Sequence, residues 1–480
     1  MLFNSIEFAI FLPLVFAAYW FLFSKHLRIQ NIFVVAAGYL FYGWWDPRFL
    51  SLIVISSLVD YFTGVALEKT SPSRRRKKLL AVSIVTNIGF LSVFKYFDFF
   101  AASFSDAFTL LGHPINVRSL NIALPVGISF YTFQTMSYSI DVYRGRLKPI
   151  RDIWAFFAFV SFFPQLVAGP IERATNLLPQ FTKSRVFDYE AAADGMRQIL
   201  LGMFKKVVIA DTLARVVEKT FSDYATLSGS TLWLGAVCFS FQIYCDFSGY
   251  SDIAIGTSRL FGFSLQRNFA NPYFSRDIGE FWRRWHISLT TWFRDYLYIP
   301  LGGSRGSTIQ VIRNTFIVFT VSGLWHGANW TFVAWGFFNA LLFIPLMLRK
   351  KNRDHLDTPA SGHLLPTAIE LAQMTWTFLL VTVGWVLFRA ESISHAGQYL
   401  LRMFSASVLS LPEIVKDNEI VMLLPIGFLL LLEWFGREKA HAMAVEHLRP
   451  VQRRGLYAIL FMFIFFLGDF GETQFIYFQF

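Results

Sequence analysis

The sequence predicts an all-α polytopic membrane protein, and three observations support that prediction. The 480 residues are 55% hydrophobic and 18% aromatic. Only 16% are charged, whereas a soluble domain carries about 25%. Apolar runs close to the ~20 residues that a helix needs to cross a bilayer recur along the chain. We therefore expect about eleven or twelve transmembrane helices, accompanied by re-entrant or interfacial helices, within a single membrane domain over residues 1–480.

The first three apolar runs cover residues 7–23, 31–45 and 49–67. No basic segment precedes the first run and no small-residue cleavage site follows it, so we expect a retained helix and not a signal peptide. After the third run comes the basic stretch RRRKK, residues 74–78, which the positive-inside rule places in the cytoplasm. The N-terminus is then extracytoplasmic, and we expect a multi-pass protein of the cytoplasmic (inner) membrane.

The next runs are residues 79–94, which lead outward, and 122–140, which return to a basic segment. The run 153–168 ends in FFPQLVAGPIER. If this run crossed the membrane, the basic residues after it would lie outside, so we expect a re-entrant segment that turns back at Pro164 and Gly169. Non-helical backbone at this depth is tolerated where protein or a cavity covers it.

Residues 206–219 and 232–247 are expected to form the next two crossings. The segment 248–313 is too polar to face lipid and too rich in Phe, Trp and Tyr for a solvated loop, so we expect interfacial or re-entrant helices that line a cavity from the cytoplasmic side. The remaining apolar runs are 314–323, 328–348, 367–388, 421–435 and 455–470. With the basic loop 437–454 inside, this order places the C-terminus outside.

The charge and the cysteines exclude several kinds of function. The net charge is +11, but the basic residues lie beside apolar runs, so we expect them to meet anionic membrane lipid and expect no nucleic-acid partner. Cys238 and Cys245 lie in one apolar run and provide neither a disulfide framework nor a CxxC metal site. Because no cluster of His, Cys and carboxylates has metal-ligand spacing, we also expect no metal. No GxSxG, GxxxxGK[ST] or HExxH motif occurs.

One candidate site is the segment VSGLWHGANW, residues 321–330. An ionisable residue at membrane depth is costly and is often functional, which makes His326 a candidate general base toward a hydroxyl. The small residues Gly323, Gly327 and Ala328 allow close backbone approach or a helix break. The alternative is a histidine that only forms a hydrogen bond between packed helices.

The second candidate site is FWRRWHISLTTWFRDYLYIPLGG, residues 281–303. On a continuous helix Trp282 and His286 would share one face, as would Arg283 and Ile287. The basic side chains could then meet a polar or anionic ligand against a wall of tryptophan. The alternative is a membrane-surface helix with its tryptophans in the aromatic belt and its arginines at the headgroups.

Two carboxylates, Asp246 and Asp252, lie at the end of an apolar run in YCDFSGYSDIAIG. Carboxylates at such a position could mark an ion path. They could also hold a turn together through Asx hydrogen bonds, and we expect this second role.

The two candidate sites resemble the two signature regions of the membrane-bound O-acyltransferases. The segments SFFPQLVAGPIER, QIYCDFSGYSDIAIG and NFANPYFSRDIGEFWRRWH are similar to the bacterial branch that contains the alginate O-acetylation proteins. The opening MLFNSIEFAIFLPLVFAAYW and the final FIYFQF fit that branch too. The resemblance covers nearly the whole chain, and several long motifs in the same order make it specific.

The resemblance implies a ring of tilted helices around shorter, re-entrant ones, with a central intramembrane catalytic tunnel where a funnel from each membrane face meets. The family's intramembrane histidine falls on His326, and its second histidine falls on His286. The implied activity is acyl transfer to a hydroxyl, which in this branch is acetyl transfer that serves an exported polysaccharide such as alginate. Acetyl-CoA is the expected donor substrate from the cytoplasm, and we expect no bound cofactor.

Within this interpretation we expect His326 to polarise the incoming hydroxyl and His286 to orient or assist it. The expected substrate-binding residues are Trp282, Arg283, Arg284, Trp285, Arg294, Asp295, Trp325 and Asn329. The expected partners are extracytoplasmic acetyltransferases or other polysaccharide-modification proteins, and membrane lipid. The rival functions are D-alanyl transfer toward teichoic acid, acylation of a lipid or a protein, a transporter without chemistry, and a non-catalytic export scaffold. A transporter predicts inverted repeats, and none is visible in the sequence.

The C-terminal tail ETQFIYFQF is apolar for a free terminus, so we expect it to dock against the protein or a partner. It resembles the tail of a small partner protein of the teichoic-acid D-alanylation pathway, in which a tyrosine is implicated in relaying the acyl group. That resemblance makes Tyr477 a candidate catalytic residue. The alternative is an interfacial aromatic anchor.

Overall fold

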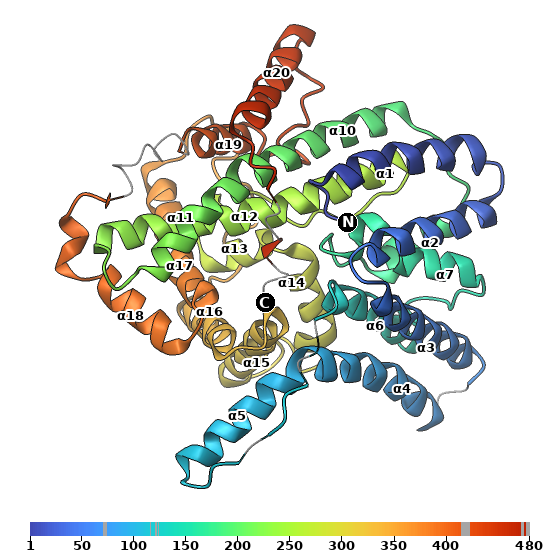
Figure 1. The fold of residues 1–480 in the computed structure, drawn as a ribbon, viewed down its shortest axis with the longest axis horizontal. Helices are drawn as coiled ribbons and strands as arrows, with labels where there is room; N and C mark the ends of the chain where they lie inside the picture. The colour runs from blue at the N-terminus through green and yellow to red at the C-terminus, as the bar shows by residue number, and fades with distance from the viewer. Residues whose placement is uncertain are drawn as a thin grey trace. The chain divides into compact units, whose positions relative to one another are not determined.

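The computed structural model describes residues 1–70, 74–115, 117–120, 122, 124–413, 423–471 and 475–476. Every regular element in these ranges is a helix, which confirms the predicted all-α class (Figure 1). The chain divides into two compact units, and each is described by itself below. The first comprises Met1–Ala192 and Thr257–Gln266, and the second comprises Ala193–Gly256 and Arg267–Phe480. The expectation of a single membrane domain stays a prediction.

The first unit is built mainly from α1 to α9. Its helices are α1 (Ile6–Ala17), α2 (Leu27–Gly43), α3 (Leu50–Glu68), α4 (Arg74–Leu91), α5 (Phe97–Leu110), α6 (Ile128–Tyr143), α7 (Ile153–Val160), α8 (Phe163–Leu166) and α9 (Ala174–Leu177). Helix α3 packs against α4 and α6, and α2 packs against α7.

A buried carboxylate joins three helices of the first unit. Asp60 on α3 accepts hydrogen bonds from Asn87 Nδ2 on α4, at 2.8 Å, and from Ser139 Oγ on α6, at 2.6 Å. Ser83 on α4 donates a further hydrogen bond to it. A buried charge is tolerated when hydrogen bonds satisfy it, so this network fixes α3, α4 and α6 against one another.

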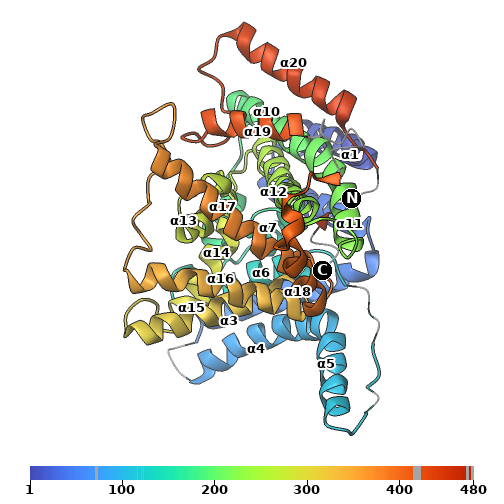
Figure 2. The same ribbon diagram turned by 90° about the vertical axis from the view of Figure 1, so that its left-hand side faces the viewer.

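One expectation for the first unit is wrong, and another is supported. The residues after Phe94 were expected to form a polar-aromatic external segment, but they form α5, which follows α4 through the π-helical turn η3 (Ser92–Tyr96). Figures 1 and 2 show α5 bending away from α4 there, as a π-bulge allows. Helices α7 and α8 have eight and four residues and are too short to span a bilayer, in agreement with a re-entrant segment.

The second unit contains most of α10 and α12 and all of α11 and α13 to α20. Its longer helices are α10 (Tyr189–Met203), α11 (Asp211–Ser222), α12 (Gly229–Leu260), α15 (Thr308–His326), α16 (Trp330–Leu348), α17 (Ala368–Arg389), α18 (Ile393–Met403), α19 (Leu423–Phe435) and α20 (Pro450–Leu467). The shorter ones include η5 (Phe204–Ala210), α13 (Ile278–Arg284), α14 (Ile287–Phe293) and η7 (Arg294–Tyr298).

Helix α12 corrects two expectations. Its 32 residues run without interruption past Phe247, where a crossing was expected to end. Asp246 and Asp252 therefore lie inside a helix and not in an Asx turn. Helix formation continues there because no Pro interrupts the sequence between Gly229 and Leu260. The two carboxylates find their partners on other helices, as described below.

Helices α15 and α16 form a close antiparallel hairpin, and Figure 2 shows them lengthwise, one beside the other. A Cβ added to Gly323 on α15 would clash with the backbone oxygen of Phe332, and one added to Gly336 on α16 would clash with that of Phe319. The two glycines thus let the backbones approach one another, as small residues do in membrane helix pairs. This hairpin holds His326 at the last residue of α15.

Five helical segments in the described ranges are long and apolar enough to cross a membrane by length and composition. They are Pro47–Glu68, Arg74–Leu110, Trp330–Leu348, Ala368–Arg389 and Pro450–Leu467. Ile6–Leu22 and Leu423–Phe435 are shorter apolar helices. The chain is thus a multi-pass helical protein, while the larger count of eleven or twelve crossings remains an expectation.

Candidate active site

The segment around His286 is a broken helix, not the continuous one that was expected. Helix α13 ends at Arg284 and α14 begins at Ile287, with His286 between them in the left-handed conformation at φ 42° and ψ 55°. A residue with a side chain rarely adopts this conformation, which costs of order 1–3 kcal/mol and often occurs at functional sites. The break changes the direction of the chain, so spacing along one helix no longer decides which side chains meet.

His286 is tightly held despite this backbone strain. The residue is only 2% exposed. Its Nδ1 lies 3.1 Å from Asn268 Oδ1. The ring of Phe247 on α12 packs against it edge-on, with 4.6 Å between the ring centroids. The imidazole therefore has a fixed position and orientation in the second unit.

His326 is enclosed by aromatic side chains. Its ring centroid lies 5.0 Å from that of Trp325, 5.1 Å from that of Trp335 and 5.3 Å from that of Phe388. The residue is 4% exposed. Such a wall keeps bulk water from the imidazole, which strengthens electrostatic interactions with any group that does enter.

The two histidines line one cavity, which we call the histidine cavity. It is lined by Trp282, His286, Leu289, Thr290, Phe293, Val318, Phe319, Ser322 and His326, and the empty space among them, including the part that is open to solvent, is about 390 Å³. The ring centroids of His286 and His326 are 6.5 Å apart. Apart from the histidines, the lining is mostly apolar, with small hydroxyls from Thr290 and Ser322. A cavity of this kind suits a small acyl group and a reacting hydroxyl better than a highly charged ligand.

The structure brings together three of the predicted site residues in this cavity, namely Trp282, His286 and His326. Trp325 lies beside them, because its ring centroid is 5.9 Å from that of His286. The structure describes the other predicted substrate-binding residues too, but they do not line the histidine cavity. They are Arg283, Arg284, Trp285, Arg294, Asp295 and Asn329.

Several of those side chains have structural contacts instead. Arg283 donates to the backbone oxygens of Asn352 and His355 at 2.9 and 2.7 Å. Arg284 forms an ion pair with Glu280 at 2.9 Å. Their charge is therefore directed to a neighbouring loop and to α13.

The remaining predicted residues are similarly engaged. Arg294 pairs with Asp295 at 2.7 Å within η7. The Trp285 ring packs against that of Trp385, with 4.9 Å between centroids. Asn329 caps α16 by accepting from the N–H of Thr331 and donates to the backbone oxygen of Glu391.

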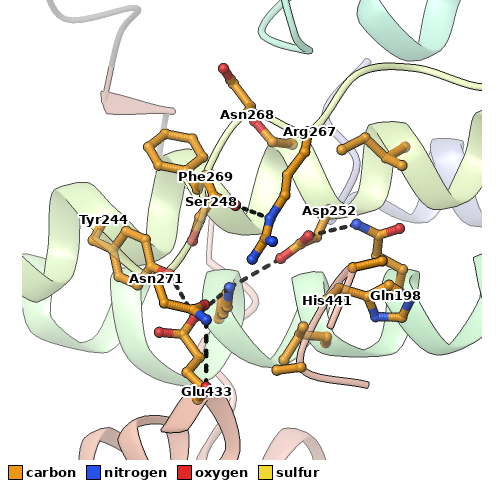
Figure 3. A pocket seen from close by; sticks show the side chains of 16 residues that line it. Gln198, Tyr244, Ser248, Asp252, Arg267, Asn268, Phe269, Asn271, Glu433 and His441 are labelled. Atoms are coloured by element: carbon orange, nitrogen blue, oxygen red, sulfur yellow. Dashed lines mark hydrogen bonds and ion pairs between the residues drawn. The ribbon is translucent and has the colours of Figure 1, made fainter. Parts of the chain in front are cut away.

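A second cavity, which we call the polar cavity, lies next to Asn268 (Figure 3). It has a volume of about 360 Å³, and its polar lining residues are Gln198, Lys205, Tyr244, Ser248, Ser251, Asp252, Arg267, Asn268, Asn271, Glu433 and His441. Lys205 Nζ pairs with Asp252 at 3.1 Å and with Glu433 at 2.9 Å. Sequence reasoning missed this cavity because its residues come from segments far apart in the chain.

A related buried ion-pair network contacts Ile476, close to the end of the chain. Lys206, the neighbour of Lys205 in η5, pairs with Asp211 at 2.7 Å and with Asp246 at 2.8 Å. The other oxygen of Asp246 accepts from the backbone N–H of Ile476 at 2.7 Å. The docked tail that the sequence predicted is thus observed at this residue.

Phe475 completes the docking of the tail. Its ring centroid lies 4.9 Å from that of Tyr250 and 5.9 Å from that of Phe247, and Phe247 is the residue whose ring contacts His286. A single aromatic ring therefore separates Phe475 from His286 in the histidine cavity. Tyr477, the predicted relay residue, directly follows Ile476 and lies outside the described residues.

No group of three or more His, Cys, Asp or Glu side chains suited to a metal ion occurs among the residues that the structure describes. The acid–base groups of the histidine cavity are the two imidazoles. Their chemistry is that of proton transfer and hydrogen bonding, which suits the transfer of an acyl group to an oxygen.

Comparison with known proteins decides the family. The profile of the MBOAT, or membrane-bound O-acyltransferase, family matches residues 11–379. The chain belongs to the membrane-bound O-acyltransferase family. It is a membrane O-acyltransferase of the alginate O-acetylase branch, because its relatives there are similar over most of their length.

Three relatives illustrate the placement of this acyltransferase. A probable alginate O-acetylase AlgI of Pseudomonas aeruginosa is 38% identical over 94% of this chain and 84% of the relative. The probable alginate O-acetylase AlgI of Azotobacter vinelandii is 40% identical over 87% of this chain and 80% of the relative. A peptidoglycan O-acetyltransferase of Helicobacter pylori is 34% identical over 87% of this chain and 82% of the relative.

Proposed function

We propose that this acyltransferase transfers acetyl groups from acetyl-CoA, which enters from the cytoplasm, for the O-acetylation of an exported polysaccharide such as alginate. The observation that supports this most directly is the pair of buried histidines in one small, largely apolar cavity. The names of the relatives support an acetyl group. The protein would lie in the cytoplasmic (inner) membrane with both termini outside, and polysaccharide-modification proteins outside the membrane would be its partners.

In the proposed reaction the acceptor hydroxyl attacks the thioester carbonyl carbon. The new C–O bond forms as the C–S bond breaks, and the thiolate of CoA leaves and takes up a proton. His326 acts as the general base that accepts the hydroxyl proton. The buried cavity limits competing attack by water. No metal or resident cofactor is involved in this proposal.

The immediate acceptor is proposed to be the phenol of Tyr477. A phenol has a pKa near 10, so its acyl ester is a better donor than an ester of a sugar hydroxyl. The docking of Phe475 and Ile476 against α12 supports this proposal, because Phe475, two residues before Tyr477, contacts the ring of Phe247, which in turn contacts His286. The acyl group would then pass to an extracytoplasmic acetyltransferase.

The donor is tested with the purified protein in proteoliposomes and acetyl-CoA that carries a radioactive acetyl group. We expect label to appear on the protein in the presence of acetyl-CoA and to be lost in the Tyr477→Phe variant. D-alanyl-carrier thioester is the comparison donor. Labelling by the D-alanyl donor and not by acetyl-CoA would contradict the acetyl proposal in favour of its closest rival.

A further inference from the structure

Asn268 lies between His286 and the polar cavity. Its side-chain oxygen Oδ1 is 3.1 Å from His286 Nδ1, and its amide Nδ2 donates to Ser251 Oγ at 3.1 Å. Its backbone oxygen accepts from the N–H of Ile287 at 2.9 Å. Both Asn268 and His286 are buried. Figure 3 shows Asn268 among the residues that line the polar cavity.

The neighbours of Asn268 determine which of its amide atoms faces His286. The backbone N–H of Ser288 donates to Oδ1 at 3.3 Å, and the Ser288 hydroxyl donates to the same atom at 2.9 Å. A backbone N–H can only donate, so the atom opposite it must be an acceptor, the carbonyl oxygen. This contact fixes the orientation of the amide, which geometry alone leaves ambiguous.

The orientation of the amide in turn determines the tautomer of His286. An amide oxygen can only accept, so the Nδ1 that faces it must carry the hydrogen. A neutral imidazole has a single N–H, and its other nitrogen carries a lone pair. Nε2 of His286 is therefore a hydrogen-bond acceptor on a ring that lines the histidine cavity.

We propose that Asn268 is a positioning residue that holds His286 as the Nδ1–H tautomer, so that Nε2 can accept a hydrogen bond from the substrate hydroxyl. The identity of that hydroxyl rests on the proposed function, whereas the tautomer does not. His286 then orients the oxygen while His326, 6.5 Å away between ring centroids, takes the proton. Around metal-ligating histidines, loss of such a supporting residue typically costs about 10- to 100-fold in activity, and we expect a loss of the same order here.

The surroundings of His286 make the tautomer measurable. Among the described residues, the rings that pack against it include those of Phe247, Phe269, Trp325 and His326. Among these neighbours His326 is the titratable one. The polar contacts of His286 Nδ1 are with Asn268 and Ser288, which are both uncharged. A charge introduced at position 268 therefore acts on His286 first.

The direct test is solid-state ¹⁵N NMR of histidine-labelled protein in lipid bilayers. The His286 signals are assigned by their loss in His286→Gln. We expect the Nδ1–H tautomer in the wild-type protein and a mixture of tautomers, or the Nε2–H form, in Asn268→Leu. A wild-type His286 in the Nε2–H form would overturn the proposal, whatever the donor of the enzyme proves to be.

The second test compares Asn268→Asp with Asn268→Leu in acetyl-transfer kinetics. Asp keeps an acceptor for Nδ1, so we expect activity within about tenfold of wild type. Its charge stabilises the imidazolium form and raises the pKa of His286, so the acidic limb of the pH–rate profile should move to higher pH. Leu should lower kcat about 10- to 100-fold with KM for the donor nearly unchanged.

The matched control is Asn314→Leu. This buried asparagine hydrogen-bonds to Leu301 and Gly303 near the other end of α15, and it has no contact with either histidine in the described structure. It should retain wild-type kcat. Equal losses in both Asn268 variants, with unmoved pH profiles, would overturn the positioning role. If wild-type protein does not use acetyl-CoA, the proposed donor fails, and the NMR measurement still decides the role of Asn268.

Discussion

His326 is surrounded by aromatic rings and ends a rigid helix, so its replacement changes the acid–base chemistry of the cavity more than its packing. We expect His326→Ala to lower polymer O-acetylation about 10²- to 10⁴-fold while the protein still inserts and accumulates in the membrane. O-acetyl content of the polymer from complemented deletion cells is the measurement. His363→Ala, at an exposed position in a loop, is the control and should behave as wild type. Wild-type acetylation by His326→Ala would contradict its catalytic role.

Tyr477→Phe separates the relay from an aromatic anchor. The change keeps the ring and removes the hydroxyl, so an anchor should tolerate it and an acyl relay should not. We expect polymer acetylation to fall to background, as measured by release of acetate from the purified polymer. Tyr224→Phe, which removes a hydroxyl bonded to Gln398 elsewhere in the second unit, should leave acetylation unchanged. Normal acetylation by Tyr477→Phe would end the relay proposal and leave the family assignment intact.

Single residues differ in how well the sequence predicts them. His326, His286 and Trp282 were identified because they lie in long motifs, and the structure places all three in one cavity. Asn268 was not identified although it begins the motif NFANPYFSRDIGEFWRRWH, because nothing in the motif shows which of its side chains meets His286. It is 18 positions before His286 in the chain, and only the left-handed backbone at His286 turns the imidazole toward it. Hydrophobic periodicity carries no information about such a break.

At the scale of elements, one carboxylate of α12 contributes a hydrogen bond to the docking of the C-terminal tail, beside the ring contacts of Phe475. Asp246→Ala removes the acceptor of the Ile476 N–H. Loss of a hydrogen bond to a charged group costs about 1.5–3 kcal/mol, so the undocked tail should become roughly 10- to 100-fold more populated. We expect faster trimming of the C-terminus by carboxypeptidase, measured by intact mass, and reduced acetylation.

Asp252→Ala is the matched control for that experiment. Asp252 lies on the same helix and also pairs with a lysine of η5, but its described contacts are Lys205 and Gln198. Like Asp246→Ala, this variant disrupts an ion pair with a lysine of η5, but it leaves Asp246, the acceptor for the Ile476 N–H, in place. Equal trimming rates in the two variants would show that Asp246 does not hold the tail.

Apolar helices were predictable at this scale, and irregular ones were not. The runs expected at 328–348, 367–388 and 455–470 correspond to α16, α17 and α20, with bounds that differ by a few residues. The π-helix η5 was not predictable, because its extra residue per turn depends on what Lys205 and Lys206 meet on α12 and α19. Helix α18 was missed because it is short and amphipathic, with Arg402 in its last turn.

At the scale of the whole molecule, the orientation in the membrane is open to direct measurement. The basic loops predict that cysteines introduced at Arg75 and Lys351 react with an impermeant maleimide only after the cytoplasm is opened. One introduced near Ser228, at the exposed Ala225, should react in intact cells. Each is placed in a variant without Cys238 and Cys245, which are buried. Labelling of the Arg75 position in intact cells would reverse the assigned orientation and with it the side from which the donor enters.

The lysine pair of η5 has a consequence for how the chain is inserted during synthesis. A charge left in lipid costs about 2.5–3.5 kcal/mol on the scale of translocon insertion, and the segment that carries Lys205 and Lys206 emerges before α12 and long before α19. Asp211, which pairs with Lys206, follows soon after it in the chain, but the other carboxylate partners, Asp246, Asp252 and Glu433, arrive with those later helices. We therefore expect this segment to stay beside the translocon, or bound to an insertase, until α12 has been synthesised. Membrane insertion of this protein would then be sequential, because the segment with Lys205 and Lys206 would enter the lipid only together with α12.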